Sequence, residues 1–404
     1  MHSQSIFGPH FNFTDLPRTM TQTIRHRIVF SMIAAFCAFT STAANSNATP
    51  APPPPQIDAR GYVLIDFDSG SVIAQKKSRE RMEPASLTKM MTAYIVLGEL
   101  ASGKVSMQDK VTISEKAWRM PGSRTFVEVG KKVPLETLLK GLIVQSGNDA
   151  TVALAEHIAG DEDVFATVMN QTATTLGMKD THFVNSTGLP SPQHYTTAFD
   201  MATLARALIQ SFPEHYAWYS IKKFTHNGIT QHNRNTLLWK DDRVDGIKTG
   251  HTTSAGYCLV ASAKEGNMRL ISVVLGAKSE NSRAVESKKL LSYGFRFFET
   301  HRLYAPHEPL TTVRVWKGDT DQLPLGLDRE MYITIPRGQY DKLNASMKVV
   351  PTITAPVSKG KHFGSVEVSL NDEIVGEQPL VALKEIPEGG FFSQMIDDVK
   401  ILFE

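Results

Sequence analysis

Ser86 and Lys89 stand three residues apart in the stretch PASLTKMM. In a helix this spacing puts the two side chains on one face, one turn apart, so that the hydroxyl can touch the amine. A lysine held against a buried helix has a lowered pKa and can accept a serine proton. Pro84 favours a helix start, and the N–H groups of a helix N-terminus favour an oxyanion. The pair is a candidate nucleophile and base.

The spacing alone is not specific, because it recurs at Ser220 and Lys223 and at Ser358 and Lys361. A lone pair of this kind is more often a partial helix cap beside a solvated lysine. The interpretation therefore depends on other motifs in the chain.

A second motif, Ser146-Gly147-Asn148, falls between two stretches with helical patterns, at 135–145 and 150–159. On such a turn the hydroxyl and the carboxamide can face a cleft. The alternative is that Asn148 or Asp149 caps the following helix.

A third motif, Lys248-Thr249-Gly250, opens a late strand region. It offers a cation and a hydroxyl to a carboxylate, and a glycine that lets backbone approach a substrate; the alternative is a solvated strand edge. Ser-x-Asn also recurs at Ser279 and Ser369, but one set alone runs in the order S-x-x-K, S-x-N, K-T-G. That order makes the set a combined candidate site.

The composition excludes several other classes. The chain has 404 residues, 41% of them hydrophobic, and a net charge of +2 from 43 basic and 41 acidic residues. This is the composition of a soluble protein of two domains, without the basic field of a nucleic-acid binder. No His-Glu-x-x-His occurs and the histidines are scattered, so we expect no metal site and no cofactor. Gly-x-Ser-x-Gly is absent, which disfavours an α/β-hydrolase.

Residues 1–48 have the pattern of a signal peptide with an upstream extension. A basic stretch at 25–27 precedes the apolar run 28–39 and the small and polar residues 40–48. The apolar run is shorter than the roughly 20 residues of a spanning helix, so we expect export, with a buried N-terminal helix as the alternative. Cleavage after Ala43 or Ala48 fits equally, and Met20 is a possible start. Cys37 lies in the signal, which leaves Cys258 alone and excludes an intrachain disulfide in the mature protein.

The remaining pattern predicts two domains after a Pro-rich linker at 49–58. Strands at 62–67 and 71–75, helices at 84–100, 135–145, 150–159 and 199–211, strands at 256–263 and 268–277, and a helix at 282–298 indicate one α/β domain, 59–301, with a helical insertion. Short alternating segments at 311–316, 331–335 and 365–370 predict a small all-β sandwich, 302–388. The tail, 389–404, has the stripe of an amphipathic helix, formed by Phe392, Met395, Ile396, Val399 and Phe403.

On these motifs the chain resembles the penicillin-recognising serine enzymes, and within them the D-alanyl-D-alanine carboxypeptidases of the low-molecular-mass penicillin-binding proteins. The resemblance runs from GYVLIDFDSG through PASLTKMM, SGNDA, HFVNSTGLP, HNRN and KTGHT to the β domain and the tail. It implies a β-lactamase/transpeptidase-like catalytic domain, an antiparallel sheet with helices and a helical subdomain, followed by the β sandwich.

The resemblance also implies roles. Ser86 would attack the carbonyl between two D-alanines with Lys89 as base, Ser146 would pass a proton to the departing amine, and Asn148 would hold the peptide. The terminal carboxylate would meet Lys248, Thr249 and Arg234, beside Gly250. The N–H groups of Ser86 and His251 would form the oxyanion hole. Taken alone, Arg234 would more often be in an internal ion pair and His251 in the core.

Peptidoglycan stem pentapeptides would be the substrate and β-lactams covalent inhibitors, because the Glu-x-x-Leu-Asn loop of class A β-lactamases is missing between Asn148 and Lys248. The alternatives are a D,D-endopeptidase acting on cross-links and a non-catalytic penicillin-binding scaffold.

The resemblance implies that the tail lies flat on the periplasmic face of the inner membrane, too short to span it. The alternative is a helix packed on the β domain. Asp397, Asp398 and Glu404 outnumber Lys400, so anionic lipid would repel the tail.

Overall fold

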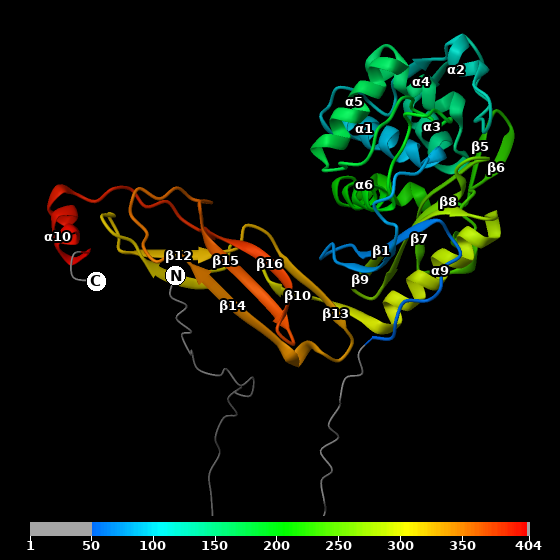
Figure 1. The fold of residues 1–404 in the computed structure, drawn as a ribbon. Helices are drawn as coiled ribbons and strands as arrows, with labels where there is room; N and C mark the ends of the chain where they lie inside the picture. The colour runs from blue at the N-terminus through cyan, green and yellow to red at the C-terminus, as the bar shows by residue number, and fades with distance from the viewer. Residues whose placement is uncertain (1–50, 402–404) are drawn as a thin grey trace, which may run out of the picture. The chain divides into compact units, whose positions relative to one another are not determined.

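The computed structural model describes residues 51–401, so the predicted signal segment lies outside the described residues. The first domain is built on one antiparallel sheet in the order β2-β1-β9-β8-β7. Its strands are β1 (Gly61–Asp66), β2 (Val72–Lys76), β7 (Val244–Thr252), β8 (Gly256–Glu265) and β9 (Met268–Ala277). The two ends of the domain sequence thus pair in the middle of the sheet, as Figure 1 shows.

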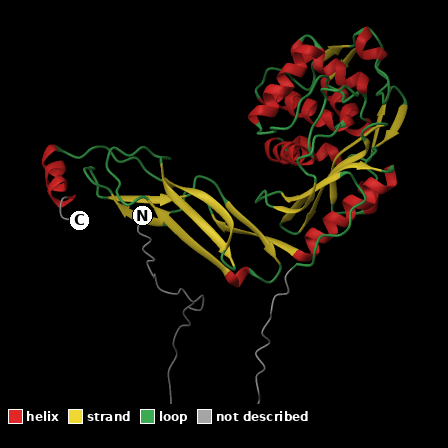
Figure 2. Ribbon diagram, in the orientation of Figure 1, coloured by secondary structure: helices red, strands yellow, loops and turns green. Residues whose placement is uncertain are grey.

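Residues on β1 and β9 alternate between two apolar cores. Val63 and Val273 join the core under the helical subdomain, whereas Leu64 and Val274 join the core under α9 (Glu280–Phe297). Because side chains alternate along a strand, a sheet covered on both faces needs such near-continuous apolar runs. The result is a three-layer α/β domain, which confirms the predicted fold class (Figure 2).

The helical subdomain lies in the sequence between β2 and β7. Its helices are α1 (Lys89–Ala101), α2 (Glu115–Arg119), α3 (Leu135–Lys140), α4 (Asn148–Ala159), α5 (Glu162–Thr175), α6 (Ala198–Ser211), α7 (Pro213–Tyr216) and α8 (Leu237–Lys240). Two hairpins accompany them: β3 (Lys110–Thr112) with β4 (Lys132–Pro134), and β5 (Lys223–His226) with β6 (Ile229–His232). The sequence analysis did not predict α5 or these hairpins.

Two predicted helices differ in detail from the structure. The helix expected from residue 84 begins as a 3-10 turn, Ala85–Thr88, and becomes α-helical at Lys89. Ala85 has φ +48°, outside the helical region, so a regular helix cannot include it. The helix expected at 135–145 is α3 followed by a π-helical turn, Gly141–Gln145. Both irregular turns lie directly beside motif residues, where local strain often concentrates.

The segment before β1 has no regular secondary structure but is held by the first domain. The carbonyl oxygen of Pro52 accepts a hydrogen bond from Tyr293 at 2.7 Å, and Ile57 is buried in the core under α9.

The second domain is formed by strands, as predicted. One sheet has the order β11-β12-β16-β15-β14 and a second pairs β10 with β13. The strands are β10 (Phe298–Tyr304), β11 (Thr311–Arg314), β12 (Gln322–Gly326), β13 (Met331–Pro336), β14 (Leu343–Val349), β15 (His362–Leu370) and β16 (Glu373–Ala382). Their inward side chains form a separate core, and α10 (Phe391–Ile401) follows.

Candidate active site

Ser86 lies in the 3-10 turn that precedes α1, at the edge of a cleft of about 510 Å³. Its Oγ is 3.0 Å from Nζ of Lys89. Lys89 is fully buried at the first residue of α1, and Nζ also donates to the carbonyl oxygen of Thr187 at 2.7 Å. The predicted contact between hydroxyl and amine is therefore present.

The protonation of Lys89 is set by its surroundings. Burial is the largest cause that lowers its pKa, to about 7, and the positive charge of Arg234 lowers it further, whereas Asp149 and Glu162 act in the opposite direction. At neutral pH a large fraction of this lysine is therefore the free amine, and a free amine can accept the proton of Ser86.

Ser146 and Asn148 reach the same cleft from the turn between α3 and α4. Ser146 has φ +66°, a left-handed conformation that is strained for a residue with a side chain. Among the described residues, no group bonds Oγ of Ser146 or Oδ1 of Asn148, although both atoms are buried. Nδ2 of Asn148 donates to Pro121 at 2.6 Å, which points the free oxygen away from that contact. Two buried polar atoms of residues that line the cleft thus lack a hydrogen-bond partner among the described residues, which is uncommon in a folded protein.

The capping alternative for Asn148 is wrong, since the N-cap of α4 is Gly147. Asp149 does accept an N–H of the first turn of α4, that of Ala150 at 2.8 Å, and it also accepts the backbone N–H groups of Thr125 and Phe126, at 2.7 and 2.8 Å. It fixes the loop that carries Ser123, another lining residue, to the start of α4.

The third motif lies on β7, the edge strand beside the Ser86 turn. A Cβ added to Gly250 would lie 2.9 Å from the carbonyl oxygen of Pro84 and 3.2 Å from the backbone nitrogen of Ser86. A side chain would force strand and turn apart, so this close approach explains the glycine. Thr249, Gly250 and His251 line the cleft, and Lys248 lies beneath them, 3% exposed.

Several cations surround this part of the cleft. Burial lowers the pKa of Lys248 well below its ordinary value, with smaller contributions from Lys89, Arg234 and Arg283. Arg234 is exposed in the cleft, and its side chain forms no ion pair in residues 51–401, so the internal ion-pair alternative is wrong. The guanidinium groups of Arg234 and Arg283 keep their positive charge here, and this charge suits an anionic ligand.

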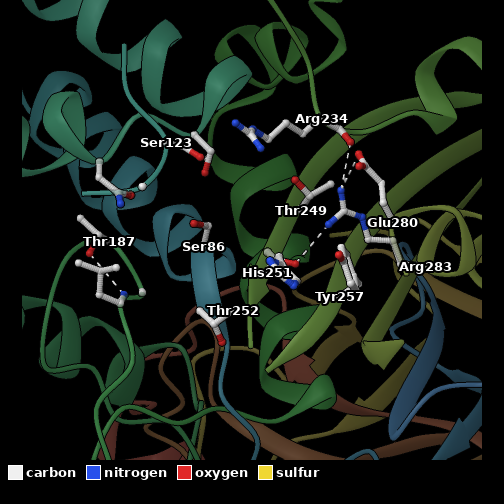
Figure 3. A pocket seen from close by; sticks show the side chains of 16 residues that line it. Ser86, Ser123, Thr187, Arg234, Thr249, His251, Thr252, Tyr257, Glu280 and Arg283 are labelled. Carbon is white, nitrogen blue, oxygen red and sulfur yellow. Dashed lines mark hydrogen bonds and ion pairs between the residues drawn. The ribbon is translucent and has the colours of Figure 1, made fainter. Parts of the chain in front are cut away.

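The structure adds residues that no motif indicated. The buried guanidinium of Arg283 on α9 donates to the carbonyl oxygens of Gly250 and Arg234 and pairs with Glu280 at 3.2 Å (Figure 3). Arg283 therefore ties together two segments of the cleft wall.

His251 is exposed and stacks on Tyr257 with ring centroids 4.0 Å apart, so the core alternative is wrong.

All nine predicted site residues are thus brought together: Ser86, Ser146, Asn148, Arg234, Thr249, Gly250 and His251 line the cleft, and Lys89 and Lys248 lie buried beside it. Within the described part of the chain, no three His, Cys, Asp or Glu residues gather in a way that could hold a metal ion.

Comparison with known proteins gives the relatives of this arrangement. The family described as D-alanyl-D-alanine carboxypeptidase matches residues 46–279, and that described as penicillin-binding protein 5, C-terminal domain, matches 298–388. The D-alanyl-D-alanine carboxypeptidase DacA of Escherichia coli K12 is 44% identical over 92% of this chain and 96% of its own length. Penicillin-binding protein 5 from Haemophilus influenzae has a similar structure, with a TM-score of 0.80 and 43% identity over 83% of this chain and 99% of that one.

A more distant similarity covers less of the chain. Penicillin-binding protein D2 from Listeria monocytogenes, solved in its ampicillin-bound form, gives a TM-score of 0.56 and 28% identity over 60% of this chain and all of that one. The chain belongs to the D-alanyl-D-alanine carboxypeptidase family.

Proposed function

We propose that this protein is a serine D-alanyl-D-alanine carboxypeptidase that removes the terminal D-alanine of peptidoglycan stem pentapeptides through an acyl-enzyme on Ser86. One observation carries the proposal. Oγ of Ser86 lies 3.0 Å from a buried amine whose pKa is about 7, at the edge of a cleft that also holds Ser146 and the K-T-G strand. A serine beside a neutral amine is an activated nucleophile.

In the acylation step, Lys89 takes the Ser86 proton as Oγ forms a bond to the carbonyl carbon between the two D-alanines. The oxyanion is bound by the N–H groups of Ser86 and His251, a type of contact worth about 3–4 kcal/mol in rate. Ser146 relays this proton from Lys89 to the departing amine nitrogen, giving up its own hydroxyl proton as it receives the one from Lys89, and the C–N bond breaks. Oδ1 of Asn148, unpaired in the cleft, accepts an N–H of the peptide.

The terminal carboxylate is bound by Lys248, Thr249 and the exposed guanidinium of Arg234. Water then hydrolyses the ester on Ser86 and releases the shortened peptide. β-Lactams acylate Ser86 in the same way and leave slowly, since the sequence has no Glu-x-x-Leu-Asn loop to activate the water. The relative solved in its ampicillin-bound form supports the binding of β-lactams.

The test is D-alanine release from a peptide ending in D-Ala-D-Ala, together with penicillin adducts followed by mass. Ser86→Ala should abolish both signals. Ser220→Ala is a matched control, because Ser220 has the same spacing to Lys223 but its exposed hydroxyl donates to Ala217. Adducts without D-alanine release would favour an endopeptidase or a non-catalytic scaffold. The absence of both signals in the unmodified protein would contradict the proposal.

We also propose that the protein is exported and that α10 lies on the periplasmic face of the inner membrane. Phe391, Met395, Ile396 and Val399 are 52–76% exposed on this helix. Between residues 51 and 401, no helix has the length and apolar character to cross a bilayer. An exposed apolar stripe on a short helix suits binding in the plane of the interface.

One acidic residue of the tail, Asp397, forms a hydrogen bond within the protein. A carboxylate oxygen of Asp397 accepts the backbone N–H of Lys317 at 2.7 Å.

Replacing all four exposed apolar residues of α10 by serine should abolish flotation of the protein with zwitterionic vesicles. Serine at the exposed Met347 and Ile374 of the β domain is the control and should leave flotation unchanged. Equal binding of both variants would contradict the membrane contact.

A further inference from the structure

The peptide group between Ala85 and Ser86 carries both the N–H of Ser86 and the carbonyl of Ala85. That carbonyl oxygen accepts a hydrogen bond from Oγ1 of Thr88 at 2.8 Å. Oγ1 of Thr88 in turn lies 2.8 Å from Nε2 of His194. Ala85, Thr88 and His194 are at most 2% exposed, so water does not compete for these bonds.

The other ring nitrogen of His194, Nδ1, determines which atom is the donor in each of these hydrogen bonds. Nδ1 faces the backbone N–H of Val184 at 3.2 Å and must act as an acceptor there. The ring proton is therefore on Nε2 and is donated to Thr88, whose own hydroxyl proton goes to Ala85. All bonds run one way, from Val184 through His194 and Thr88 to the Ala85 carbonyl.

Hydrogen bonds arranged head to tail in a buried environment polarise one another. A donor at the carbonyl oxygen of a peptide also draws electron density from its nitrogen, so the N–H at the other end becomes a stronger donor. Here that N–H belongs to Ser86, whose nitrogen lies close to Gly250 on β7.

We propose that Thr88 and His194 are positioning residues that polarise and orient the Ala85–Ser86 peptide, and thereby strengthen the Ser86 N–H as an oxyanion donor. The inference rests on the proposed role of Ser86 as nucleophile. Thr88 and His194 touch no substrate atom and act only through this peptide.

The loop after α5 supports the orientation of the same peptide. Gly188 has φ +85°, and a Cβ there would collide with the Ala85 carbonyl oxygen. The Gly188 backbone thus packs directly against this carbonyl, while Ala85 itself is held at φ +48°. The peptide plane is fixed by contacts from two separate segments of the chain.

The test reads the oxyanion hole directly. Penicillin with an isotope-labelled lactam carbonyl is bound to the full protein, and infrared difference spectroscopy measures the ester carbonyl stretch of the acyl-enzyme. Stronger hydrogen bonds lower this frequency, so Thr88→Val should raise it. The acylation rate should fall about two- to eightfold, the share expected if a donor worth 10²- to 10³-fold is weakened by about 10–30%.

Thr88→Ser keeps the hydroxyl and should restore both the frequency and the rate. Thr92→Val is the matched control, because the hydroxyl of Thr92 is equally buried and donates to the Ser186 carbonyl at 2.8 Å. It removes the same kind of bond without touching the Ser86 peptide, so the frequency should not move.

A second variant protects the test against misfolding. Thr88→Val combined with His194→Leu removes both partners of the Thr88–His194 bond, so the buried ring N–H is not left without an acceptor, and only the longer bond from the half-buried Val184 loses its acceptor. A raised frequency in this double variant supports the proposal. An unchanged frequency in folded Thr88→Val or in the double variant overturns it. Absence of any adduct in the unmodified protein would overturn the proposed function, and this inference with it.

Discussion

Nζ of Lys89 lies 2.7 Å from the carbonyl oxygen of Thr187, 98 residues further along the chain. A neutral amine has two N–H groups and one lone pair. The Thr187 carbonyl uses one of the N–H groups, which leaves the amine able to turn its lone pair toward Oγ of Ser86 at 3.0 Å. A backbone carbonyl from a distant loop therefore orients the proposed base.

The rate of acylation should follow the titration of Lys89. Because only the free amine accepts a proton, the rate of penicillin adduct formation should rise with pH and level off above about 7, the pKa of Lys89. Glu162→Gln removes a negative charge that raises this pKa, so the midpoint should move to lower pH. Quenched acylation assays from pH 5.5 to 9, at pH intervals of about half a unit, measure both midpoints. A rate that still rises steeply at the upper end of this range, instead of levelling off, would contradict a role for Lys89 as base.

The sequence predicted the residues of the site better than it predicted the contacts among them. Ser86, Lys89, Ser146, Asn148 and Lys248 belong to short motifs in which residue type and spacing carry the information. Each motif needs only its own turn or strand to present the side chains, so local pattern was sufficient.

The contacts supplied by backbone atoms could not be predicted in this way. The carbonyls of Thr187 and Gly250 are available in any sequence, and their positions depend on how the loops pack. Arg283 lies in an ordinary amphipathic helix, with no pattern that marks it as a residue of the cleft. The left-handed Ser146 was equally hidden, because a positive φ at serine has no sequence signal.

Backbone strain at Ser146 should make the glycine variant more stable than the alanine variant at this position. At φ +66° an L-residue is strained and glycine is not, so Ser146→Gly should be more stable than Ser146→Ala by about 1 kcal/mol, while both lose activity. Urea unfolding measures the difference. Exposed Gln171 within α5 is the control, since there the glycine variant should be the less stable one by about 1 kcal/mol. If the glycine and alanine variants had the same order of unfolding free energy at both positions, backbone strain at Ser146 would not be the cause of the difference.

Arg234 should matter only for substrates that end in a free carboxylate. Arg234→Ala should raise KM about tenfold for a peptide ending in D-Ala-D-Ala, which is the lower range for a hydrogen bond to a charged group because this side chain is exposed. The same peptide with a C-terminal amide is the control substrate, and its KM should change little. An equal increase for both peptides would mean that Arg234 supports the cleft wall rather than the carboxylate.

His194 should make folding sensitive to acid. Burial is the main cause that lowers its pKa from 6.5 to about 4, with further contributions from His182 and Lys89. Above pH 6.5 neither state binds the proton. Between about 4 and 6.5 the unfolded chain binds a proton that the folded protein excludes, so stability falls as pH falls, by roughly 3 kcal/mol in all.

The variant His194→Gln isolates this contribution, because every other titrating group is shared. At pH 7 the variant should be the less stable protein, since it loses the buried bonds to Thr88 and Val184. The difference in unfolding free energy should then shrink by roughly 3 kcal/mol as the pH falls to about 4. Urea titrations of both proteins at several pH values measure it. A difference that stays constant with pH would mean that His194 takes up its proton in the folded protein as easily as in the unfolded chain.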